Sequence, residues 1–71
     1  MAAADDRSVA RLQVQLADAR DQLSAAEQFR DRAEPGSADY LRWVRVASRS
    51  WMRVRRLERE LEAVRLANAR H

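Results

Sequence analysis

"EPGS", residues 34–37, contains the only proline and the only glycine of this 71-residue chain. Proline interrupts a helix, and glycine reaches the backbone conformations that reverse a chain at little steric cost. Ser37 suits the N-cap of a following helix, and Asp39 would then face the positive end of that helix. The stretch therefore predicts one turn, between a helix of about residues 6–34 and a helix of about residues 38–69.

Both helical segments carry mostly apolar or small residues at alternating steps of three and four, which is the spacing of a coiled-coil seam. The paired seam positions are Val9, Leu12, Leu16, Ala19, Leu23, Ala26, Arg30 and Ala33 in the first segment, and Tyr40, Trp43, Ala47, Ser50, Val54, Leu57, Leu61 and Val64 in the second. Asn68 continues the same spacing beyond Val64. Antiparallel pairing about the turn gives layers whose residue numbers always sum to 73. The pattern predicts an all-α fold: one antiparallel helical hairpin over residues 1–71.

The predicted layers differ in size along the seam. Near the turn, Ala26 meets Ala47 and Leu23 meets Ser50. Such small layers either let the helices approach closely or leave space that a partner fills. One layer further toward the turn, Arg30 is expected to lie over the ring of Trp43 as a cation–π contact.

A second apolar surface lies outside the seam. On a helical wheel, Leu41, Val44 and Trp51 widen the apolar arc of the second helix to about 200°, and one neighbouring helix covers only about half of that. Phe29 and Val46 lie at the other edge of the seam. We therefore expect a homodimer that forms a four-helix bundle, with a hetero-partner or a larger bundle as the alternatives.

The second helix also carries a row of arginines, which we call the Arg ridge: Arg42, Arg45, Arg49, Arg53 and Arg56. The row lies opposite the apolar arc, and residues 42–56 contain no acid. Residues 1–34 carry a net charge of −2 and residues 35–71 carry +5.

Three interpretations of the Arg ridge stay open. It can be an ordinary solvent-exposed helix face. That interpretation explains why these residues are charged, but not why all of them are positive. It can recognise an acidic helix or tail of a partner protein. It can also bind phosphates, as a dimer of helical hairpins does in the Rop-type RNA-binding proteins of plasmids. Membrane binding ranks last, because the first helix already covers about half of the apolar arc.

The sequence gives no sign of catalysis, so we predict that the chain is not an enzyme and needs no cofactor or metal. It has no Cys, its one His is the terminal His71, and no glycine-rich phosphate loop is present. No apolar run approaches the roughly 20 residues of a membrane-spanning helix, and the start lacks the features of a signal peptide. A cytoplasmic location is expected.

The second helix resembles the N-terminal docking segments of modular polyketide synthase subunits, over residues 38–66. Asp39, Tyr40, Leu41, Arg42 and Val44 match the opening of those segments. The later match, in residue type, covers Arg53, Arg55, Arg56, Leu57, Glu58, Glu60, Leu61 and Glu62. The resemblance implies a docking module that dimerises as a parallel coiled coil and receives an acidic C-terminal helix of an upstream subunit. A whole helix precedes the motif here, which implies a helical-hairpin variant of that arrangement.

Overall fold

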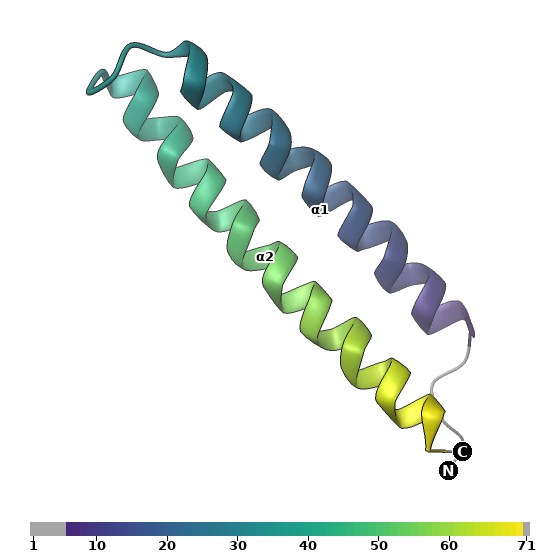
Figure 1. Ribbon diagram of the computed structural model, residues 1–71. Helices are drawn as coiled ribbons and strands as arrows, with labels where there is room; N and C mark the ends of the chain where they lie inside the picture. The colour runs from purple at the N-terminus through teal and green to yellow at the C-terminus, as the bar shows by residue number, and fades with distance from the viewer. Residues whose placement is uncertain (1–5, 71) are drawn as a thin grey trace.

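The computed structural model describes residues 6–70, and it consists there of two α-helices that pack against each other as an antiparallel hairpin (Figure 1). Helix α1 spans Asp6–Arg32 and α2 spans Ala38–Ala69. The described part contains no β-strand. The all-helical expectation is thus confirmed, and α1 ends two residues before the expected residue 34. Residues that precede a proline avoid the helical conformation, which explains the earlier end. His71 lies outside the described residues.

The turn has the backbone geometry that its sequence predicts. Gly36 has a φ of 81°, a backbone conformation that residues with a Cβ atom rarely adopt. Ser37 is the N-cap of α2, and its Oγ accepts a hydrogen bond of 3.1 Å from the Tyr40 backbone N–H. Asp39 lies in the first turn of α2, where a negative charge is favourable.

The core follows the predicted seam. All sixteen paired seam positions are buried or half-buried. The fully buried ones are Leu16, Ala19, Ala26, Ala47, Val54, Leu57 and Leu61. Five of these form one continuous cluster toward the open end of the hairpin, and Val9, Leu12 and Leu23 pack against it.

The layer of Arg30 and Trp43 is built differently from the expectation. The ring of Trp43 stacks on Phe29, with centroids 4.7 Å apart, and the cation over the indole is Arg42, at 5.4 Å. Arg30 instead forms an ion pair of 3.1 Å with Asp31. The prediction that Arg30 covers Trp43 is therefore wrong. A flat aromatic ring offers Trp43 more apolar contact than a guanidinium that has a carboxylate beside it.

Candidate partner-binding face

The Arg ridge lies along α2, from its first turn to its middle. Arg42, Arg45, Arg49 and Arg56 are exposed, and Arg53 is half-buried. The helical steps of three and four align these side chains, as the sequence predicts, because residues at those spacings share one face of a helix.

Two members of the ridge already have partners within the hairpin. The Nη1 of Arg53 donates a hydrogen bond of 3.1 Å to the Oε1 of Gln22 on α1. The Arg42 guanidinium lies over Trp43. Within residues 6–70, Arg45, Arg49 and Arg56 form no ion pair or hydrogen bond. These three guanidinium groups are the part of the ridge that is free to bind an external acid.

A shallow basic hollow lies beside the ridge on α2. Trp51 and Met52 line it together with Arg49, Arg53, Arg55, Arg56 and Arg59. The guanidinium of Arg55 lies 5.5 Å from the centroid of the Trp51 ring. Sequence reasoning did not assign Arg55, Arg59 or Met52 to a site. Arg55 and Arg59 follow Trp51 by four and eight residues, so the helical spacing could have placed them on its face, whereas Met52 is its chain neighbour and carries no such signal.

The apolar face predicted from the wheel is largely open to solvent. Leu41 is 50% exposed and Trp51 is 55% exposed, while Val44 is half-buried. Met52 adds a further side chain that is 66% exposed. Single exposed apolar residues are common on proteins, but a contiguous group on one helix face points to an interaction surface.

Phe29 and Val46 were predicted to belong to the same interaction surface, at its other edge. Phe29 is 46% exposed, and its ring is held against Trp43. Val46 is half-buried. Neither residue lines the basic hollow described above, and their place in the same interaction surface stays a prediction.

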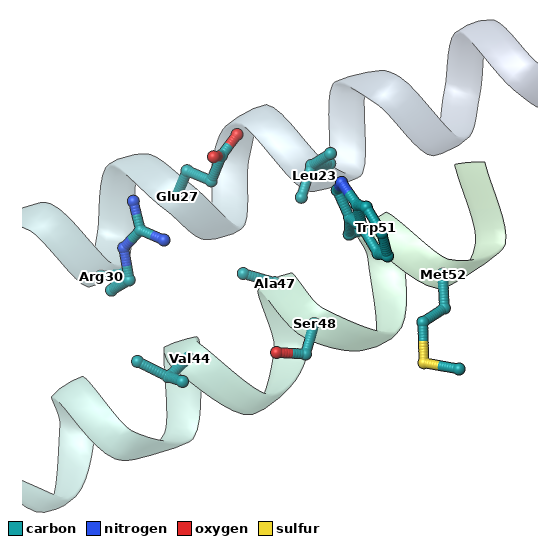
Figure 2. Close-up of a pocket in the computed structure, with 8 residues that line it drawn as sticks. All are labelled: Leu23, Glu27, Arg30, Val44, Ala47, Ser48, Trp51 and Met52. Atoms are coloured by element: carbon teal, nitrogen blue, oxygen red, sulfur yellow. The ribbon is translucent and has the colours of Figure 1, made fainter. Parts of the chain in front are cut away.

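A second hollow, which is mainly apolar, lies between the helices at the small layers of the seam (Figure 2). Its lining comes from both helices: Leu23, Glu27 and Arg30 of α1, and Val44, Ala47, Ser48, Trp51 and Met52 of α2. Leu23 and Trp51 lie at one end, Arg30 and Val44 lie at the other, and Met52 extends away from α1. Of the two possibilities that the small layers left open, the structure shows space beside the seam.

One ion pair joins the two helices. The Oε2 of Glu58 on α2 lies 3.3 Å from the Nη2 of Arg20 on α1. Asp18 accepts a hydrogen bond of 3.3 Å from Gln22. These exposed contacts are worth little individually, but they take acids away from the arginines of α2.

Residues 6–70 contain neither a candidate metal site nor a candidate membrane span. No group of three or more His, Cys, Asp or Glu side chains there could hold a metal ion. Neither helix in that range is long and apolar enough to cross a membrane.

Comparisons of this chain with protein-family models, with curated proteins and with solved structures found no match. We therefore infer the function from the geometry and chemistry of α1 and α2.

Proposed function

We propose that this chain is a non-catalytic protein-docking module. It self-associates through its apolar face, and it recognises an acidic helix or tail of a partner protein through the Arg ridge. The observation that carries the proposal is the set of three exposed guanidinium groups, on Arg45, Arg49 and Arg56, that no acid of the described hairpin neutralises.

The chemistry of the surrounding surface supports a protein partner. Guanidinium groups pair with carboxylates through two parallel hydrogen bonds, which fixes orientation as well as affinity. Aromatic residues, Met and Arg are also the residue types enriched at protein interfaces. Trp51, Met52 and the arginines around them combine all three types on one exposed surface.

The resemblance to polyketide synthase docking segments supports the same class of function. Under that resemblance, the partner is the acidic C-terminal helix of an upstream synthase subunit. Leu41 and Val44, two of the matching residues, lie on the apolar face, and the matching Arg42 belongs to the Arg ridge.

A second candidate is nucleic-acid binding, and the basic hollow is the observation that favours it. Five arginines around an exposed tryptophan offer both phosphate contacts and a ring on which a base can stack. However, Arg55 already lies over the Trp51 ring, and the exposed Leu41 and Met52 have no role in phosphate binding. We therefore favour the protein partner.

The proposed function predicts binding of a designed acidic helix. The probe is a fluorescein-labelled 20-residue amphipathic peptide with Leu on one face and Glu on the other, and its control is the same peptide with every Glu replaced by Gln. We expect the Glu peptide to bind at least about tenfold more tightly by fluorescence anisotropy, a difference of about 1.4 kcal/mol. Added salt should reduce this difference, because the contacts are exposed. Equal affinities of the two peptides would contradict the proposal.

A further inference from the structure

The apolar hollow between α1 and α2 has a lining that suits a second copy of this chain. Among its lining residues, the only charged side chains are one acid, Glu27, and one base, Arg30. An acidic partner would gain no net electrostatic attraction there, whereas the arginines of the basic hollow would attract it. We therefore expect an occupant that presents apolar side chains to the apolar hollow.

The α2 residues that line the hollow extend equally far along the chain on either side of Ser48. Val44 lies four residues before Ser48, and Met52 lies four residues after it. The centre is small, because Ala47 and Ser48 occupy it, whereas Trp51 is bulky and 55% exposed. A twofold interface requires that each copy offer both the protruding group and the space that receives it.

We propose that a second copy covers this hollow with its α2 antiparallel to the first, and that the twofold axis passes beside Ser48. Trp51 of each copy then lies over Val44 of the other, and the two Ser48 residues allow close approach at the axis. This inference rests on the self-association in the proposed function and adds its geometry.

The charges on α2 favour the antiparallel arrangement over the parallel one. Parallel pairing on the same face would place Arg55 against Arg55 and Arg59 against Arg59 of the second copy. Antiparallel pairing about Ser48 moves these arginines to the turn end of the other hairpin, at the level of Asp31 and Glu34. Both acids are exposed there; Asp31 is paired with Arg30, and Glu34 forms no ion pair within residues 6–70. Arg55 and Arg59 thus meet Glu34 and a neutral ion pair in place of each other, so charge favours the antiparallel dimer.

The experiment combines mass with one intermolecular distance. The chain has no Cys, so Ala63→Cys on the exposed side of α2 introduces a single site for a nitroxide spin label. Sedimentation equilibrium should give twice the chain mass of 8.2 kDa. Pulsed electron paramagnetic resonance should give a label separation of about 45 Å, because residue 63 is fifteen residues from the axis in each copy and the rise is about 1.5 Å per residue. A parallel dimer would give a separation below about 20 Å, because packed helices lie about 8–10 Å apart.

Two variants test which side chains form the contact. Trp51→Glu should weaken dimerisation at least about tenfold, since it places a charge over the apolar hollow of the second copy. Leu66→Glu should leave dimerisation unchanged, because the antiparallel geometry places the exposed Leu66 beyond the end of the second hairpin. A parallel dimer would instead cover Leu66.

Each other outcome overturns a defined part of the inference. A short label distance, or a dimer lost in Leu66→Glu, overturns the antiparallel geometry while self-association stands. A mass of 8.2 kDa at the highest concentration overturns self-association itself. The peptide titration reads Arg45, Arg49 and Arg56, none of which lines the apolar hollow, so failure of the docking function is seen separately.

Discussion

Replacing Leu57 with alanine is expected to lower the free energy of unfolding by about 2–4 kcal/mol, as for other large-to-small changes in a core. Leu57 is 5% exposed and belongs to the continuous cluster with Leu16 and Leu61. The hairpin has only this one seam, so the cavity cannot be compensated by a second core. Urea denaturation followed by circular dichroism measures the effect, at one fixed protein concentration because self-association contributes to stability.

The matched control for this variant is Leu66→Ala, which removes the same atoms from the same helix. Leu66 is 53% exposed, so its replacement should cost less than about 0.5 kcal/mol. If the two variants were destabilised equally, the seam described for α1 and α2 would be wrong.

Reversing two charges of the Arg ridge has the largest expected effect on binding. The double variant Arg45→Glu, Arg49→Glu should bind the acidic peptide at least about tenfold more weakly, since two attractive contacts become repulsive. Both side chains are exposed and unpaired, so the helix content should not change. Fluorescence anisotropy measures the affinity, and circular dichroism checks the fold.

The control for the reversal changes the net charge by the same amount elsewhere. Arg7 and Arg11 are exposed on α1, and the variant Arg7→Glu, Arg11→Glu also lowers the net charge by four. We expect its affinity for the peptide to stay within about threefold of the unmodified chain, because distant exposed charges are screened by salt. An equal loss of peptide affinity in both variants would show that binding depends on net charge alone and not on the Arg ridge.

The sequence allowed the hairpin to be predicted because two simple signals agree. The single turn at Gly36 fixes where the helices meet, and the heptad spacing fixes which faces meet. Every seam position is accordingly buried or half-buried. Ser37 was predicted as the N-cap for an equally local reason, and its contact with Tyr40 confirms that prediction.

The contacts that were not predicted depend on the rotamers of long side chains. Trp43 had both Arg30 and Phe29 within reach, and the choice between them depends on ring packing that helix spacing does not determine. The ion pair between Arg20 and Glu58 also depends on side-chain rotamers. Both residues lie beside the seam, and their side chains reach across it. The basic hollow was missed because wheel positions alone do not show that Arg55 folds back over Trp51.

The central claim is that the Arg ridge serves protein recognition and not nucleic-acid binding. The most direct measurement is a competition at 150 mM salt, in which the labelled acidic peptide is displaced by unlabelled peptide or by a duplex RNA of equal charge. Our account predicts that the peptide competes at least about tenfold better than the RNA. A stronger competition by RNA, falling steeply as salt rises, would contradict the account and assign the ridge to phosphate binding.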